Sequence, residues 1–232
     1  MFDTNYTTKK ATSNGVRVSV IIPCLNEVGS IEAVLNDIPK DRVDEVLVAD
    51  GGSTDGTVEL VEKMGYQIVT QEKKGFGAAI MSGINHAKGD VIVVLNADGS
   101  MNPKDIPKLL EKLNEGYDLV LASRYLKGGG SEEDTILHFI GNKFFTFLCN
   151  LLYKVNVSDV LYFFLVAKKE VFETIKPQCL NAGFCVEVPI KTAKAGFKIG
   201  EIPSFEKRRM AGKAKVNAFT TGFKILTKVL KP

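Results

Sequence analysis

The sequence predicts an α/β fold in which helices cover both faces of a mostly parallel sheet. In the first half of the chain, short and almost continuously apolar runs alternate with segments whose apolar residues recur at helical spacing. Strands that are apolar along their whole length belong to sheets buried on both faces, and regular alternation with helices is typical of parallel strands. The 232 residues suffice for one large domain with a substantial core.

Strands and helices are expected in a regular order through this first half. Each strand ends just before polar or glycine-rich residues, and the expected strands cover residues 16–23, 43–49, 66–69, 91–95 and 119–122. Proline stands at the first position of the last intervening helix, where it leaves no N–H unpaired. The expected helices lie at residues 28–38, around 58–61, at 76–87 and at 103–113.

The second half is less regular. A glycine-then-acid loop is expected at residues 128–134, and further strands are expected at residues 160–167 and 198–202. The last strand leads into a basic loop and an amphipathic helix at about residues 219–230. The chain therefore divides into a flexible tail, a folded α/β domain and a C-terminal amphipathic helix, at residues 1–15, 16–215 and 216–232.

The apolar segment Ile136–Tyr153 has two interpretations, because Asn142, Lys143, Thr146 and Asn150 interrupt it. It is either a helix buried in the core, which we favour, or a helix that lies at a membrane surface. Since the chain has no uninterrupted apolar run of about 18 residues, no transmembrane helix is expected.

Charge and cysteine usage narrow the function classes. The net charge is only +3, but residues 187–232 carry eleven Lys or Arg against three Glu. That region is either a solvated face or a surface that meets phosphates or anionic lipid. Four scattered cysteines and two histidines argue against a zinc site and suit a reducing compartment. No nucleic-acid partner is expected, and residues 1–14 contain no apolar signal core.

Polar residues follow three of the predicted strands. In open parallel sheets, ligands bind beyond the carboxyl ends of the strands. Asn26 and Glu27 follow the first strand, residues 50–53 the second, and residues 96–100 the fourth. The sequence therefore predicts a ligand site at this edge of the sheet.

Asp98 is the candidate metal ligand of this edge. It lies in the order Asn96-Ala97-Asp98-Gly99-Ser100, just past an apolar strand and two residues from a second oxygen ligand. Mg²⁺ and Mn²⁺ prefer oxygen ligands and accept substrate phosphates to complete their coordination. Read alone, the segment fits an ordinary Asp-Gly turn better than a metal site.

The other segments of this edge offer contacts to a nucleotide. Asp50 can accept hydrogen bonds from a base or ribose, whereas Asp55 is expected to cap the next helix. Asn26 or Glu27 can contact ribose hydroxyls, and a helix cap by Asn26 is the alternative. Gly75 indicates close helix packing, with loop backbone near the ligand as the alternative. Neither a dinucleotide-binding G-x-G-x-x-G after the first strand nor a triphosphate-binding P-loop is present.

Together these segments resemble a known family. Residues 23–27, 50–57, 75–79 and 96–100 appear in the order and spacing of family 2 glycosyltransferases. Two further features resemble the branch that contains dolichol-phosphate mannosyltransferase and its bacterial and archaeal relatives. These are Ser123-Arg124-Tyr125 with Gly128-Gly129, and Glu201-Ile202-Pro203 followed by Arg209 and Gly212. The resemblance extends over residues 16–230.

The resemblance implies an inverting enzyme with a GT-A nucleotide-diphospho-sugar transferase fold, a UDP- or GDP-sugar donor, and Mg²⁺ or Mn²⁺. It places the metal on Asp98, with Asn96 and Ser100 as further ligands. It assigns catalysis to Asp98, Arg124 and Arg209, and acceptor phosphate binding to Arg124, Arg209 and Lys215. The donor contacts fall on Pro23, Leu25, Asn26, Glu27, Asp50, Gly52, Ser53, Asp55, Gly75, Asn96 and Ala97.

In this branch the acceptor is a polyprenyl phosphate such as dolichyl or undecaprenyl phosphate. Its phosphate oxygen attacks the anomeric carbon, so little general-base help is needed, and the protein positions the reactants and stabilises the leaving diphosphate. The resemblance therefore implies peripheral association with the cytoplasmic face of a membrane, with a membrane protein as a possible partner.

Three departures from the family pattern leave alternatives open. Asn96 replaces the usual first Asp of the metal motif, Phe163 stands where relatives carry Gly, and Lys213-Ala214-Lys215 follows Gly212. One alternative is transfer to a glycan hydroxyl, which needs a general base, with Glu187 as the nearest candidate. Another is a degenerate member that binds nucleotide-sugar without turnover.

Overall fold

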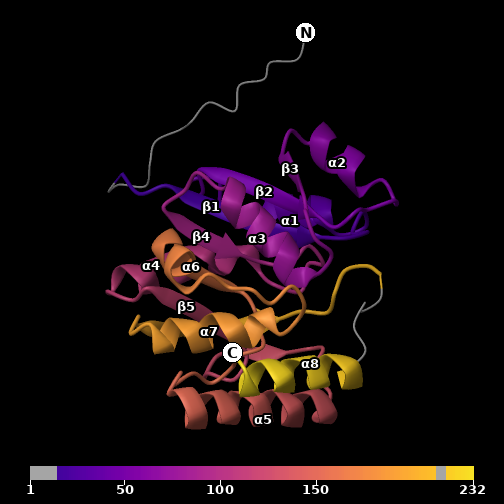
Figure 1. Cartoon of the computed structure of the whole chain (residues 1–232). Coiled ribbons are helices and arrows are strands. Elements are labelled where there is room, and N and C mark those ends of the chain that lie inside the picture. The colour runs from indigo at the N-terminus through magenta and orange to yellow at the C-terminus, as the bar shows by residue number, and fades with distance from the viewer. Residues whose placement is uncertain (1–14, 213–217) are drawn as a thin grey trace.

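The computed structural model describes residues 15–212 and 218–232, and its centre is a seven-stranded sheet in the order β3-β2-β1-β4-β7-β5-β8 (Figure 1). The predicted strands of the first half and the predicted last strand are confirmed to within two residues at each end. The strands are β1 (Val18–Cys24), β2 (Glu45–Asp50), β3 (Gln67–Thr70), β4 (Val91–Val94), β5 (Leu119–Ser123), β7 (Leu165–Lys168) and β8 (Ile199–Pro203). A separate two-stranded sheet pairs β6 (Gly130–Ser131) with β9 (Phe205–Glu206) in parallel.

The helices cover both faces of the large sheet. They are α1 (Ile31–Asp37), α2 (Thr57–Lys63), α3 (Phe76–His86), α4 (Ile106–Asn114), α5 (Ile136–Tyr153), α6 (Lys169–Ile175), α7 (Phe184–Lys194) and α8 (Ala218–Leu230), with a 3₁₀ turn at Pro103–Asp105 before α4. Neighbouring residues of β1 point into different cores. Ile21 packs in the cluster that includes α3 and α7, whereas Val20 and Ile22 pack in the cluster that includes α1 and α4. The continuously apolar strands are therefore buried on both faces, as predicted.

The sheet is mostly parallel, but β7 runs antiparallel to both of its neighbours, β4 and β5. The strand expected at residues 160–167 is correspondingly shorter and begins at Leu165. The Asp159 carboxylate accepts the N–H groups of Leu161 and Tyr162, so these groups form a local turn in place of strand pairing.

Two helices and one helix start differ from the sequence expectation. No helix was expected at α6 or α7, and α7 contains Pro189, a residue that normally ends a helix. The helix expected from residue 28 begins at Ile31, because residues 26–30 form the loop after β1. The predicted tail at residues 1–15 lies outside the described residues apart from Gly15.

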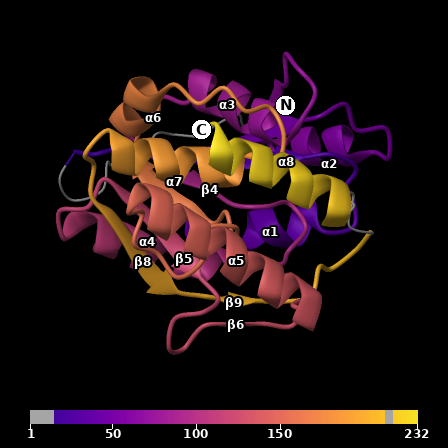
Figure 2. The same cartoon turned by 60° about the horizontal axis from the view of Figure 1, so that its bottom comes forward.

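The favoured expectation that α5 is buried in the core is wrong. Only Thr146 and Cys149 are buried, and α5 packs on α7 and α8 at the outside of the molecule (Figure 2). The polar residues that interrupt the apolar run point inward. The Asn150 side chain pairs with both backbone groups of Val157, and the Thr146 hydroxyl accepts the N–H of Val160.

The apolar side chains of α5 consequently face outward. We call them the outer face of α5: Ile136, Leu137, Phe139, Ile140, Phe144, Phe147, Leu151 and Leu152, which are 45–82% exposed. The adjoining α8 is the predicted C-terminal amphipathic helix, with Ile225 and Val229 buried. No helix in the described part of the chain combines the length and the apolar character that a bilayer span requires.

Candidate functional site

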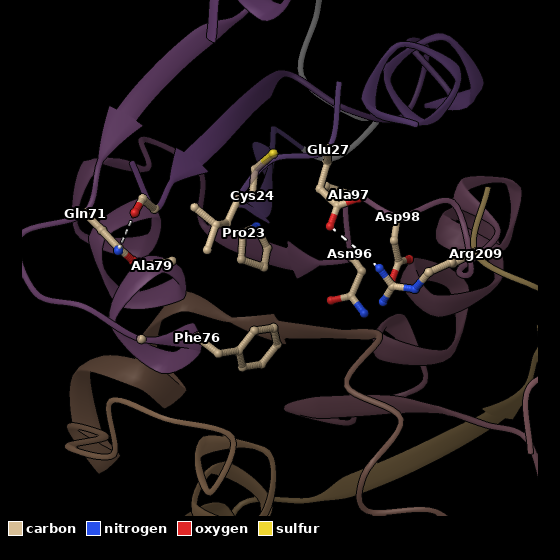
Figure 3. A pocket seen from close by; sticks show the side chains of 13 residues that line it. Pro23, Cys24, Glu27, Gln71, Phe76, Ala79, Asn96, Ala97, Asp98 and Arg209 are labelled. Atoms are coloured by element: carbon tan, nitrogen blue, oxygen red, sulfur yellow. Dashed lines mark hydrogen bonds and ion pairs between the residues drawn. The ribbon is translucent and has the colours of Figure 1, made fainter. Parts of the chain in front are cut away.

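A cavity of about 360 Å³ opens at the carboxyl ends of β1, β2 and β4, at the edge where the sequence predicts a ligand site (Figure 3). Its walls come from the loops after these strands, the start of α3 and one side chain from far along the chain, Arg209. The lining residues are Pro23, Cys24, Leu25, Glu27, Gly51, Gln71, Gly75, Phe76, Ala79, Asn96, Ala97, Asp98 and Arg209.

The loop after β1 is tied to the loop after β2. Asn26, with a backbone φ of 51°, donates its N–H to the Ser53 hydroxyl and accepts the N–H of Thr54, both at 2.8 Å. Asn26 therefore bridges two loops and does not cap a helix. It shapes the cavity wall from behind, whereas Pro23, Leu25 and Glu27 line the cavity directly.

Asp55 contributes to the same junction. Gly56, and not Asp55, occupies the position before α2, but the Asp55 carboxylate accepts the N–H groups of Thr57 and Val28 at 3.1 and 3.2 Å. Burial raises the pKa of Asp55, but the hydrogen bonds from the Thr57 hydroxyl and from these two N–H groups outweigh it and hold the pKa below its usual value. Asp55 thus stabilises the loop as an anion.

Asp50 is buried and does not line the cavity. Its carboxylate accepts the N–H groups of Gly52 and Ser53, at 2.8 and 3.1 Å, and also the Ser53 hydroxyl. The polar group that faces the cavity at this end is Gln71, whose amide nitrogen donates to the carbonyl oxygen of Gly51 at 3.1 Å. Sequence reasoning missed Gln71, although it directly follows β3 at the same edge of the sheet.

Gly75 and Phe76 bring the start of α3 to the cavity. The N–H groups of Gly77 and Ala78 both point to the carbonyl oxygen of Leu180, at 3.0 and 3.4 Å. A Cβ atom on Gly75 would lie 2.0 Å from that same oxygen. Gly75 therefore permits close packing, as predicted, and these two amides are not available to a phosphate.

The candidate metal site centres on Asp98. Its Oδ1 accepts the N–H and the hydroxyl of Ser100, at 3.0 and 2.7 Å, and its Oδ2 faces Arg209. Ser100 orients the carboxylate from outside the cavity lining, whereas Asn96 lines the cavity with Asp98. Within residues 15–212 and 218–232 no group of three Asp, Glu, His or Cys side chains converges to hold a metal ion. One carboxylate and one amide oxygen suit a hard cation that takes its remaining ligands from phosphates and water.

Arg209 reaches Asp98 from a segment 111 residues further along the chain. Its guanidinium Nη2 lies 3.0 Å from Asp98 Oδ2, and its Nη1 lies 3.8 Å from Glu27 Oε1 (Figure 3). Its backbone N–H donates to Glu133, just before α5. The structure thus brings together three predicted site residues, Glu27, Asp98 and Arg209.

Arg124 lies away from this cavity. Its guanidinium donates to Asp159 at 2.7 and 3.1 Å and to Glu206 at 3.1 Å, and it lies between the rings of Tyr125 and Tyr162. Burial alone would lower the pKa of Arg124, but the hydrogen bonds and charge of Asp159 raise it above its ordinary value. The guanidinium is therefore engaged by carboxylates of the protein itself, and it borders a second cavity of about 210 Å³.

Because a buried charge left without its partner is costly, Arg124→Met is expected to lower the free energy of unfolding by about 3–5 kcal/mol. Arg124→Lys should recover only part of the loss, since an ammonium group cannot form the paired contacts of a guanidinium with Asp159. Urea denaturation measures both changes. A variant that keeps its stability but loses acceptor affinity would point to the phosphate-binding role that the resemblance implies.

Phe163, which stands where relatives carry Gly, is buried. The Phe163 ring packs between Phe76 and Phe184, at centroid distances of 6.2 and 5.4 Å, and does not line the cavity. The third predicted acceptor residue besides Arg124 and Arg209 is Lys215, which lies outside the described residues.

Glu187 is poorly placed to act as a general base. Its carboxylate is fully buried, accepts the N–H of Cys179 at 2.7 Å and pairs with Lys191 and Lys228 at 2.9 and 3.4 Å. Burial raises the pKa of Glu187, but the hydrogen bonds from Lys191 and the backbone outweigh it and lower the pKa. Glu187 is therefore an anion that is engaged by Cys179, Lys191 and Lys228. The mechanism of transfer to a glycan hydroxyl is left without the general base that the sequence suggests for it.

The sequence of the chain is similar to those of known glycosyltransferases. The family model "Glycosyl transferase family 2" matches residues 19–176, which is more than half of the chain. An uncharacterized glycosyltransferase of Mycobacterium tuberculosis is 31% identical over 213 residues, covering 90% of this chain and 93% of the relative. A dolichyl-phosphate hexose transferase of Haloferax volcanii is 31% identical over 216 residues, covering 92% of each protein.

The solved structures agree on the fold. Glucosyl-3-phosphoglycerate synthase from Mycobacterium tuberculosis, in complex with Mn²⁺, uridine diphosphate and phosphoglyceric acid, superposes with a TM-score of 0.75. The match covers 93% of this chain and 78% of that protein at 23% identity. The central sheet and its flanking helices therefore form a GT-A fold, as predicted.

Proposed function

The chain belongs to glycosyltransferase family 2, and from this premise we propose that it transfers a sugar from a UDP- or GDP-sugar to a polyprenyl phosphate with the help of Mg²⁺ or Mn²⁺. The observation that carries the choice of acceptor is the outer face of α5. This exposed apolar surface begins at Ile136, only three residues after Glu133, which is hydrogen-bonded to Arg209 of the cavity.

The cavity supports the donor half of the proposal. Its loops follow β1, β2, β3 and β4, where ligands bind in open α/β sheets, and its polar groups are spread from Gln71 at one end to Asp98 and Asn96 at the other. A nucleotide-sugar with its base near Gln71 and its diphosphate near Asp98 would contact the polar groups at both ends of the cavity. Metal and uridine diphosphate bound to the superposed synthase support the same donor class.

A divalent cation held by Asp98 and Asn96 would neutralise the charge that develops on the leaving diphosphate. The residues of the chain do the rest of the work by positioning. Ser100 holds the Asp98 carboxylate in one orientation through two hydrogen bonds. Arg209 brings a permanent positive charge to the same place, where an acceptor phosphate must come close to the anomeric carbon. Because a phosphate oxygen is already ionised near neutral pH, the step needs no general base.

The outer face of α5 supports a lipid acceptor. An 18-residue helix is about 27 Å long, and the exposed positions Ile136, Ile140, Phe144, Phe147 and Leu151 recur at helical spacing along it. A contiguous apolar surface of this kind marks a membrane or protein interaction site. Lys224 is exposed on the adjoining α8, and Lys231 is exposed just after this helix ends, so both can meet anionic headgroups.

The cavity and the outer face of α5 together suggest how the protein would lie on a bilayer. With α5 on the membrane, its first turn and Arg209 lie at the lipid surface, so the phosphate can enter the cavity while the isoprenoid chain stays in the bilayer. The relative named dolichyl-phosphate hexose transferase supports this acceptor class over the phosphoglycerate of the superposed synthase. We place the enzyme at the cytoplasmic face, alone or with a membrane partner.

Release of nucleoside diphosphate tests the reaction class. UDP- and GDP-sugars are incubated with Mn²⁺ or Mg²⁺, with and without a short polyprenyl phosphate. Release that requires both the metal and the lipid phosphate is expected, and the active donor identifies the sugar. Donor binding without release would favour a different acceptor or a binding protein without turnover, and absence of donor binding would refute the transferase function.

A further inference from the structure

The guanidinium of Arg209 contacts the same Asp98 carboxylate oxygen that the proposed metal ion would use. Asp98 Oδ1 is fully used by Ser100, so Oδ2 is the oxygen that faces the cavity, and Arg209 Nη2 lies 3.0 Å from it. The side chains of Arg209 and Asp98 are only 22% and 11% exposed. Charges shielded from water in this way interact more strongly than at an open surface.

We propose that Arg209 and the divalent cation compete for Asp98 Oδ2, so that the metal binds tightly only when it arrives with a nucleoside diphosphate. This inference rests on the metal site of the proposed function. A doubly charged cation on Oδ2 would lie within a few ångströms of the guanidinium and would be repelled by it. A diphosphate removes the conflict, because its oxygens can coordinate the metal and accept hydrogen bonds from Arg209 together.

The backbone around Arg209 is anchored in a way that allows this exchange. Met210 donates its N–H to the Asp98 carbonyl oxygen at 2.9 Å, and Lys207 donates its N–H to the Ser100 carbonyl oxygen at 2.9 Å. Met210 also covers Gly99, where a Cβ atom would lie 2.5 Å from the Met210 sulfur. The segment is thus held to the Asp98 loop by its backbone, and the guanidinium can leave the carboxylate by side-chain rotation alone.

The same anchoring keeps the released guanidinium at the cavity. The backbone N–H of Arg209 donates to the Glu133 carboxylate at 3.1 Å, and the backbone N–H of Arg208 donates to the Glu132 carboxylate at 3.1 Å. Arg209 would therefore exchange a carboxylate for a phosphate without moving its segment. The pair acts as a filter that disfavours bare metal and favours the metal–nucleotide complex.

The test is the affinity for Mn²⁺ without nucleotide, measured by the electron paramagnetic resonance signal of free Mn²⁺ and by calorimetry. Arg209→Gln is expected to bind Mn²⁺ alone about tenfold more tightly than the wild type. Arg208→Gln is the matched control, because it removes the same charge from the neighbouring, exposed side chain and should change the affinity less than about twofold. Circular dichroism checks folding, and Arg209→Ala must shift the affinity in the same direction.

Adding UDP or GDP completes the test. The nucleotide should improve Mn²⁺ affinity more in the wild type than in Arg209→Gln, since only the wild type must first displace the guanidinium. Unchanged or weaker Mn²⁺ binding by both Arg209 variants would overturn the competition while leaving the transferase function standing, and an equal gain in Arg208→Gln would do the same. Failure of every variant to bind Mn²⁺, even with nucleotide, would overturn both this inference and the proposed metal site.

Discussion

Asp98→Asn is expected to lower the turnover number by about a thousandfold or more without unfolding the protein. Asp98 supplies the carboxylate of the candidate metal pair, since the partner position carries the neutral Asn96. An amide in place of the carboxylate removes the negative charge that draws the cation to the leaving diphosphate. The change is measured as nucleoside diphosphate release at saturating donor, metal and lipid phosphate.

Asp90→Asn provides the control for this substitution. Asp90 is exposed just before β4 begins, at the opposite end of the strand from Asp98, and its carboxylate accepts a surface hydrogen bond from the N–H of Arg17. Its turnover should stay within about twofold of the wild type. A residual activity of Asp98→Asn within tenfold of the wild type would show that Asp98 does not hold a catalytic metal.

Replacing Ile136, Ile140 and Phe144 of the outer face of α5 by glutamine is expected to reduce binding to anionic lipid vesicles by about a hundredfold or more. Burial of one fully exposed apolar side chain is worth about 1.5–3 kcal/mol. The three side chains are 82%, 58% and 50% exposed, so about 3–5 kcal/mol of membrane affinity should be lost. Co-sedimentation with vesicles measures the change.

This triple variant separates membrane binding from catalysis. Its stability should change by no more than about 0.5 kcal/mol per site, because the side chains point away from the core and glutamine favours helix. Turnover of a short, water-soluble prenyl phosphate should be preserved. Val16→Gln, which alters an exposed apolar residue just before β1, is the control. Equal vesicle binding by the triple variant and the wild type would show that α5 does not contact the bilayer.

The sequence predicts the first half of the molecule well, because its signals are local. Apolar runs such as Val18–Cys24 end at the polar residues of the site, and parallel topology then gathers these residues at one edge. Glu27 and Asp98 could be placed in one site by this rule alone. Gln71 follows from the same rule but has no motif of its own to draw attention to it.

The parts that sequence reasoning missed depend on distant partners. The pattern of α5 shows two different sides, but periodicity cannot tell which side faces the core. The orientation of α5 is set by hydrogen bonds from its polar side to a distant segment. Asn150 bonds to both backbone groups of Val157, and Thr146 accepts the N–H of Val160. From the sequence alone, a helix that buries its polar side therefore cannot be distinguished from one that buries its apolar side.

The same limitation applies to charged residues. Arg124 carries a family motif, yet its surroundings are set by Asp159 and Glu206, which lie 35 and 82 residues away. The sequence makes Glu187 a candidate base, but in the structure Lys228 and other partners engage its carboxylate. For such residues the spacing in the chain gives no indication of which charges meet in space.

The nature of the acceptor is tested most directly by the chemical form of the glycosylated product. The active donor, labelled in its sugar, is incubated with the protein, Mn²⁺ and either a polyprenyl phosphate or the matching polyprenol, and label is counted in the organic phase. Label that appears only with the phosphate and is released by mild acid as free sugar is the predicted result. Equal transfer to the alcohol, or turnover that leaves both lipids unlabelled, would contradict the proposal that a lipid phosphate is the acceptor.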